Sequence, residues 1–250
     1  MSIAADTVRY ARYNLTETLR VPISWIGSIV FPSLSFCFFV LPQSSITGDR
    51  TYATAAVVQL AVFAIMTNAL FGFGLGIAQS RERPWGAFLR TLPTPGVARI
   101  LGEVCSTGLV GLVAVVPLVA LGGAFTSAAA SPARIGLGLI ALALTGLPSM
   151  FLGCCIGYAL GSKAAIAVVQ TLMFALAFGG GLFLPPEAFP KWLDALSLWL
   201  PARQARDICI WAVQGGALNG WMIPGLAAWT VALLAGALLL LRRDASRRFG

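Results

Sequence analysis

The sequence of 250 residues contains no histidine and few charged residues, which make up 10% of the chain. An average soluble domain carries about 25% charged residues. Because 58% of the residues are hydrophobic, the chain has too little polar surface to cover itself in water. The absence of histidine excludes sites in which a histidine binds a metal or activates a serine or cysteine nucleophile. We therefore expect no catalytic residue and no metal site.

Two further motifs are missing. No phosphate-binding loop of the form GxxxxGK[ST] occurs, so the chain is not itself an ATPase and is expected to hold no cofactor. The five cysteines are an odd number without metal-type spacing, which indicates small packing residues rather than a disulfide framework.

Long uncharged runs dominate what is present. A helix that crosses the hydrocarbon core needs about 20 mostly apolar residues, and a charge at its centre costs about 2.5 to 3.5 kcal/mol on insertion scales. The gaps between charges therefore predict an all-α integral membrane protein, with residues 1–250 forming a single transmembrane domain. We expect six spans, near residues 22–41, 52–78, 99–122, 136–160, 164–184 and 219–241.

The net charge of +8 follows the positive-inside rule. With the N-terminus inside, inner segments hold twelve of the 17 Lys and Arg residues. The outer set is Arg50, Arg134, Lys191, Arg203 and Arg206. This split predicts a multi-pass protein with both termini in the cytoplasm, and it explains the basic excess without nucleic-acid binding.

Residues 1–20 precede the first expected span. Val8, Ala11, Leu15 and Leu19 share one face of a helix in this segment, and arginines line another face. The pattern predicts an amphipathic helix lying in the membrane plane. A solvated leader that only supplies positive charge is the alternative.

The inner loop at residues 79–99 contains a short amphipathic pattern. Pro84 suits the first turn of a helix, and Trp85, Phe88, Leu89 and Leu92 follow at i, i+3, i+4 and i+7. The segment could dock on a cytosolic partner. Periodicity alone equally fits a membrane-surface helix without a partner.

The outer segment at residues 185–216 is broken by prolines and carries an apolar stripe. The stripe comprises Trp192, Leu193, Leu196, Trp199 and Leu200. Two short helices that enter the outer leaflet and return, a re-entrant hairpin, would fit, with the stripe packed against the fifth and sixth spans. The alternative is an interfacial loop that only anchors the protein.

Small and polar residues within the spans are informative as well. Gly153, Gly157 and Gly161 form a small-xxx-small ridge in the fourth span, and Gly72 and Gly76 repeat the spacing in the second. Such ridges allow helix backbones to approach closely. The polar groups at mid-membrane depth, Gln59, Asn68 and Gln170, are too few for an ion-coupled transporter or channel.

The two loops carry a resemblance to a known family, the membrane subunits of ABC type-2 transporters. The inner motif comprises Arg81, Glu82, Arg83, Gly86, Leu92 and Pro95. The outer motif comprises residues 179–181, Phe183, Pro185, Pro190, Trp192, Leu193, Pro201 and Arg206. The sequence resembles this family over almost its whole length, including the in-plane helix, six spans and re-entrant segment. Ala87 and Leu89 depart from the Thr and Glu common after the loop glycine.

The resemblance implies roles for particular residues. Docking to a separate cytoplasmic ABC ATPase, which would bind the ATP and Mg, would use Arg81, Glu82, Arg83, Trp85, Gly86, Phe88, Leu89 and Leu92. An outer gate would use Phe183, Pro185, Glu187, Trp192, Leu196, Trp199 and Arg206. A second copy or a related permease would complete the pathway across the bilayer of a bacterial plasma membrane.

The resemblance also implies a function, namely a non-catalytic permease for ATP-driven efflux. The apolar spans and the lack of a large outer domain favour an amphipathic small molecule, drug or lipid as substrate. Export of a polysaccharide or lipid-linked glycan is an alternative, because the same architecture serves it. A non-transporting immunity or structural membrane protein is an alternative of another class.

Overall fold

The structure, a computed structural model, describes residues 3–20, 22–82 and 96–246. Within these ranges every regular element is helical and no strand occurs, which confirms the all-α prediction. The first group of elements is α1 (Ile3–Arg20), α2 (Pro22–Ser35), η1 (Phe36–Val40), α3 (Ser44–Thr47), α4 (Arg50–Ala69), η2 (Leu70–Leu75) and α5 (Gly76–Glu82). The second group is α7 (Gly96–Phe125), α8 (Pro132–Thr145), α9 (Leu147–Ala159), α10 (Ser162–Gly179), η3 (Pro186–Ala188), α11 (Lys191–Ser197), α12 (Pro201–Gln214) and α13 (Met222–Ser246).

Five helical stretches in the described ranges are long and apolar enough to cross a membrane. They are Arg50–Glu82, Leu101–Phe125, Pro132–Ala159, Ser162–Gly179 and Met222–Asp244, and they match the second to sixth expected spans. The first expected span is helical over α2 and η1, but the apolar stretch found there, Ile29–Val40, is shorter. The count of six spans therefore stays a prediction.

The fifth span is shorter than the sequence suggested. Its helix ends at Gly179, although residues up to 184 were expected to continue it. Gly181 has a φ of +74°, a left-handed conformation that glycine adopts readily and that ends the helix. The turn directs the chain into the outer segment, which begins closer to the bundle than expected.

The stretch from α4 through η2 to α5 is the most buried of the five spans. Asp49 caps its start by accepting hydrogen bonds from the backbone N–H groups of Thr51 and Tyr52, at 2.8 and 3.1 Å. Residues such as Phe63 and Leu70 on this stretch are fully buried in the main apolar cluster. It therefore forms the centre against which the other helices pack.

The glycine ridge of the fourth span packs within the same chain. A Cβ added at Gly153 would stand 3.0 Å from the carbonyl oxygen of Ala69, and one at Gly157 would stand 2.8 Å from that of Phe73. Backbone therefore lies against backbone where α9 meets η2, as the small-residue spacing predicted. Gly76 differs, since nothing lies within 4 Å of its added Cβ.

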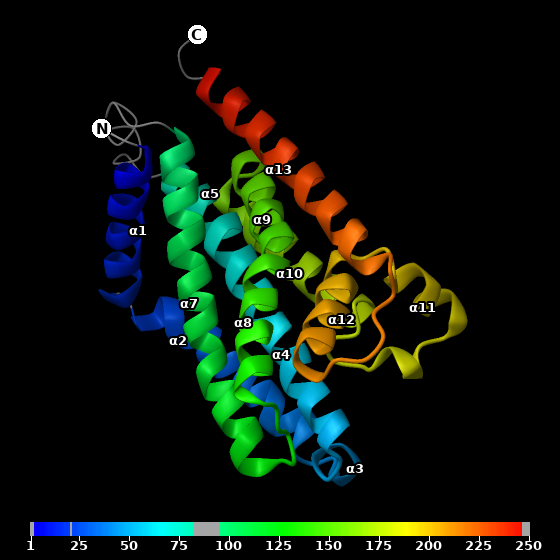
Figure 1. Cartoon of the computed structure of the whole chain (residues 1–250). Coiled ribbons are helices and arrows are strands. Elements are labelled where there is room, and N and C mark those ends of the chain that lie inside the picture. Colours follow the sequence, from blue (N-terminus) through cyan, green and yellow to red (C-terminus); the bar gives the residue numbers. More distant parts are fainter. Residues whose placement is uncertain (1–2, 21, 83–95, 247–250) are drawn as a thin grey trace.

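α1 packs closely against α7. A Cβ at Gly102 would meet the backbone N of Ala11 at 3.0 Å, while Val8 and Leu19 of the expected apolar face remain exposed. Figure 1 shows α1 following the first part of α7 lengthwise. The structure thus does not confirm the in-plane placement, because α7 is itself a candidate membrane span.

The two ends of the bundle are distinct. α1 begins and α13 ends at the end where α5 stops and α7 starts, whereas α3 and the connection from α7 to α8 lie at the opposite end (Figure 1). The first residue of α1 and the last residue of α13 therefore lie toward the same end of the bundle, and the predicted cytoplasmic placement of both termini stays a prediction. α11 and α12 lie on the flank of the bundle between these ends (Figure 1).

Candidate functional site

The first candidate site is the Arg81 junction, which comprises Arg81, Glu82, Ser162 and Asp244 at one end of the bundle. Arg81 at the end of α5 forms an ion pair of 2.8 Å with Asp244 on α13. Its Nη1 also donates to the carbonyl oxygens of Gly157 and Tyr158, both at 2.9 Å. One guanidinium thereby joins the ends of α5, α9 and α13.

Glu82 extends the junction to α10. Its Oε1 accepts from the backbone N–H of Ser162 at 2.8 Å, and its Oε2 accepts from the Ser162 hydroxyl at 2.6 Å. Ser162 is the first residue of α10, where N–H groups lack helical partners and favour a negative charge. The carboxylate therefore caps α10, and four helix ends meet at the junction.

Most of the predicted coupling segment follows directly after this junction. Its residues Arg83, Trp85, Gly86, Phe88, Leu89 and Leu92 lie outside the described residues. The structure brings together only Arg81 and Glu82 of the coupling set. Their coupling role stays a prediction.

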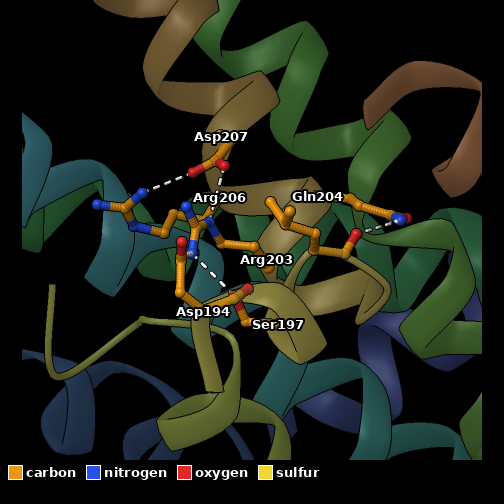
Figure 2. Close-up of polar contacts among 7 residues, drawn as sticks. Asp194, Ser197, Arg203, Gln204, Arg206 and Asp207 are labelled. Carbon is orange, nitrogen blue, oxygen red and sulfur yellow. Dashed lines mark hydrogen bonds and ion pairs between the residues drawn. The ribbon is translucent and has the colours of Figure 1, made fainter. Parts of the chain in front are cut away.

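The second candidate site is the Arg206 cluster, which comprises Asp194, Arg203, Arg206 and Asp207 together with Ser197 and Gln59. The Nε of Arg203 donates to Asp207 at 2.8 Å, and its Nη1 donates to Asp194 at 3.0 Å and to Ser197 at 2.9 Å. Arg206 pairs with the other oxygen of Asp207. Figure 2 shows this chain of contacts linking α12 to α11.

Gln59 anchors the cluster to α4. With its amide oxygen turned toward Arg206, Gln59 accepts from Nε at 2.9 Å and from Nη2 at 2.6 Å. Both residues are buried, with exposed fractions of 8% and 7%. A charged group in such a place is stable only when its hydrogen bonds are made.

The contacts of α12 also define how deep it lies. Gln214 at its last turn donates to the carbonyl oxygen of Thr51 at 2.7 Å, near the start of α4. Arg206, two turns earlier, meets Gln59. Since a helix rises about 1.5 Å per residue, α12 follows α4 for about 12 Å from Thr51 to Gln59. The helix therefore runs alongside a span instead of capping the end of the bundle.

The remaining predicted gate residues occupy separate positions. Phe183 packs in an aromatic group with Phe39, Phe63 and Phe178 at ring distances of 5.7, 4.6 and 5.3 Å. Pro185 has extended backbone before η3, and Glu187 is an exposed residue of that short helix.

The residues of the predicted apolar stripe differ in their burial and contacts. Trp192 and Leu196 are 68% and 54% exposed, so the expectation that they pack against the fifth and sixth spans is wrong for this chain by itself. Trp199 does contact the start of the sixth span. Its ring lies 5.0 Å from that of Trp221, and its carbonyl oxygen accepts from Nε1 of Trp229 at 2.8 Å.

Three charged members of the Arg206 cluster were missed from the sequence as site residues: Asp194, Arg203 and Asp207. Arg203 and Asp207 are spaced i, i+4, a signal for a helical ion pair that could have found them.

The polar side chains predicted at mid-membrane depth differ in their surroundings. Asn68 donates to the carbonyl oxygen of Thr107 at 2.8 Å, whereas Gln170 is exposed.

Neither site has the groups that a metal requires. In the part of the chain that the structure describes, no three histidine, cysteine or carboxylate side chains gather as metal ligands. The chemistry available at both sites is ion pairing and hydrogen bonding between helices. Such contacts hold or release helices.

Comparison with known proteins gives two findings. The model of the ABC-2 type transporter family matches residues 8–212. YvfS of Bacillus subtilis strain 168, which is named as a transport permease, is 22% identical over 204 residues, covering 81% of this chain and 83% of YvfS. The family match includes the Arg81 junction up to Ser162 and the whole Arg206 cluster.

Proposed function

Because the chain belongs to the ABC-2 type transporter family, it is a membrane permease subunit, and we propose that it exports amphipathic small molecules, drugs or lipids. The energy would come from a separate ABC ATPase that binds ATP and Mg. The pathway would be enclosed by two copies, or by one copy and a related permease. Both termini would lie in the cytoplasm of a bacterium.

The Arg81 junction is the observation that carries the proposed coupling. Residues 83–95, which hold the predicted docking helix, follow directly after Glu82. Arg81 and Glu82 fasten the ends of α5, α9, α10 and α13 to one another. A partner that binds the docking helix would therefore be able to shift four helices together, because short polar contacts join their ends.

The test uses alanine variants of the docking helix. Removal of an aromatic anchor from an interface hot spot often costs 2 kcal/mol or more. We expect Trp85→Ala and Phe88→Ala to lower copurification of the ATPase at least tenfold and to abolish transport-linked ATP hydrolysis, with normal membrane insertion. The matched control is Trp211→Ala, an exposed tryptophan on α12, which should leave copurification unchanged.

Two results would remove the assignment. Wild-type copurification and turnover in both docking variants would mean that the segment is a membrane-surface helix without a partner. An equal loss of copurification in Trp211→Ala would mean that general destabilisation of the protein, and not a lost interface contact, explains the effect.

The outer gate is the second part of the proposal. α12 follows α4 for about 12 Å and bonds with Gln59 there, which supports a re-entrant segment over a surface anchor. Opening such a gate would require the contacts of Arg206 to change. A cysteine pair that tethers α12 to α4 should block export while ATP still binds, and unaffected export with a verified crosslink would assign the segment as an anchor.

The substrate class is proposed from the polarity of the spans. Gln59 and Asn68, two polar side chains in the interior of α4, are already used in contacts with Arg206 and Thr107. The surrounding helices offer mainly apolar surface, which suits an amphipathic substrate better than a sugar chain. Proteoliposomes that contain this chain and its ATPase should transport a fluorescent lipid or a cationic dye across the bilayer. Transport of only a lipid-linked glycan would favour the glycan alternative.

A further inference from the structure

An apolar pocket of about 260 Å³ lies between α4, α7, α8 and α12. It extends along α4 from Thr54 to Ala61 and reaches Cys209 and Val213 on α12. No charged side chain lines it. An apolar cavity of about 150 Å³ already binds benzene, so this pocket has room for a segment of a hydrocarbon chain.

The pocket is open toward the side of the bundle. Its lining residues Val119 on α7 and Ile135 and Leu139 on α8 are 41%, 41% and 40% exposed. α7 and α8 contact each other sparsely, whereas α7 packs closely on α4 and α8 on α12. Because α4, α7 and α8 are candidate spans, a hydrocarbon chain could reach the pocket from the bilayer between α7 and α8.

Two arginines border the pocket at the end near α3. Nε of Arg50 donates to the carbonyl oxygen of Ala129, which lines the pocket, at 3.3 Å. Nη1 of Arg134 donates to the carbonyl oxygen of Ala212, the neighbour of the lining residue Val213, at 3.3 Å. Both side chains are exposed, and neither forms an ion pair within the described ranges. Each guanidinium thus keeps donors for an anion.

The pocket and its arginine border together fit one leaflet. The pocket extends along α4 from Thr54 to Ala61, a rise of about 10 Å, and the stretch from Arg50 to Ala61 rises about 16 Å at 1.5 Å per residue. Half of a hydrocarbon core about 30 Å thick is about 15 Å. We propose that the pocket holds one acyl chain of an anionic phospholipid of the outer leaflet, with its phosphate bound by Arg50 and Arg134. This site lies within one subunit and does not depend on the proposed transport, but its place in the outer leaflet rests on the proposed topology with both termini in the cytoplasm.

The first test measures lipid binding to the purified full chain in detergent. Native mass spectrometry with added phosphatidylglycerol should show one tightly retained lipid. Because one arginine near an anionic surface contributes roughly fivefold to affinity, Arg50→Gln and Arg134→Gln should each weaken binding about fivefold, and the double variant about 30-fold. Lys191→Gln removes another exposed charge, away from the pocket, and should change nothing.

The second test fills the pocket. Nothing lies within 4 Å of a Cβ added at Gly123, which lines the pocket, or at Gly136, which does not. Gly123→Phe should weaken binding of both phosphatidylglycerol and phosphatidylcholine about tenfold, the value of about two displaced methylene groups. Gly136→Phe is the matched control and should bind as the wild type does.

A photoreactive acyl chain then locates the lipid. A diazirine-bearing phosphatidylglycerol should label peptides from α4, α7, α8 or α12, which line the pocket, and excess inorganic phosphate should not compete. Labelling confined to other helices, full competition by phosphate, or equal affinity in Gly123→Phe and Gly136→Phe would each overturn the proposal. So would the absence of any retained lipid in the wild type.

Discussion

Replacement of Gln59 by leucine tests the contact between α4 and the Arg206 cluster. Leucine has a similar volume, although its side chain is one atom shorter, and it cannot accept a hydrogen bond. In Gln59→Leu, Nε and Nη2 of Arg206 lose their acceptor at 2.9 and 2.6 Å while the guanidinium stays buried. Asp207 remains bonded to Arg206, so the change removes only the link to α4.

The expected magnitude follows from the charge and the burial. A hydrogen bond to a charged group contributes about 1.5 to 3 kcal/mol, and a buried donor left without a partner costs a similar amount. We therefore expect Gln59→Leu to lower the free energy of unfolding by about 2 kcal/mol. For a chain of this size that corresponds to a melting temperature lower by roughly 5 °C.

The assay is thermal unfolding of the purified protein in detergent, followed by the reactivity of the buried Cys209 thiol. Gln170→Leu is the matched control, because it makes the same substitution at an exposed position of another span. Its effect should stay within about 0.5 kcal/mol. A double-mutant cycle with Arg206→Met should give a coupling energy of about 2 kcal/mol, since the two side chains interact directly.

Equal melting temperatures for Gln59→Leu and Gln170→Leu would refute this reasoning. A coupling energy near zero would do the same, since it would show that Gln59 and Arg206 act on separate parts of the protein. Either result would also weaken the support for a re-entrant α12, because the depth of α12 rests on this contact.

Two further predictions concern the Arg81 junction and the glycine ridge of α9. Arg81→Gln should lower the free energy of unfolding by about 1 to 2 kcal/mol. Asp244→Asn should lower it by less, because Arg81 would still donate to backbone carbonyl oxygens. A larger effect of Asp244→Asn than of Arg81→Gln in thermal unfolding would contradict this. Gly157→Leu should abolish a monodisperse peak in size-exclusion chromatography, because its Cβ would stand 2.8 Å from a backbone oxygen, whereas Gly76→Leu meets open space and should be tolerated.

The spans were predictable because the physical signal for them is local. A charge in hydrocarbon is costly wherever the rest of the chain lies, so the gaps between charges located the five helices that are long and apolar enough to cross a membrane, although the fifth ends earlier than expected. Proline likewise located the short helices, since α11 follows Pro190 and α12 begins at Pro201. The glycine ridge on α9 predicted close packing, although not that its partner is η2.

The position of Arg206 could not be predicted in this way. The sequence places it in an outer loop, where counting charges treats it as exposed to water. Its burial depends on Gln59, which is far away in the chain, and no local sequence pattern around either residue indicates that they are in contact. Trp192 and Leu196 show the reverse case, because a helical stripe predicts an apolar face without saying whether this chain covers it.

The glycine contact between α9 and η2 limits how this protein can change shape. Side chains between two helices can switch rotamers and let the helices slide, but backbone oxygens cannot. Where Gly153 lies against Ala69 and Gly157 against Phe73, any sliding would drive main-chain atoms into each other. We therefore expect α9 and η2 to keep their register in every conformation, with rearrangement confined to helices whose interfaces consist of side chains.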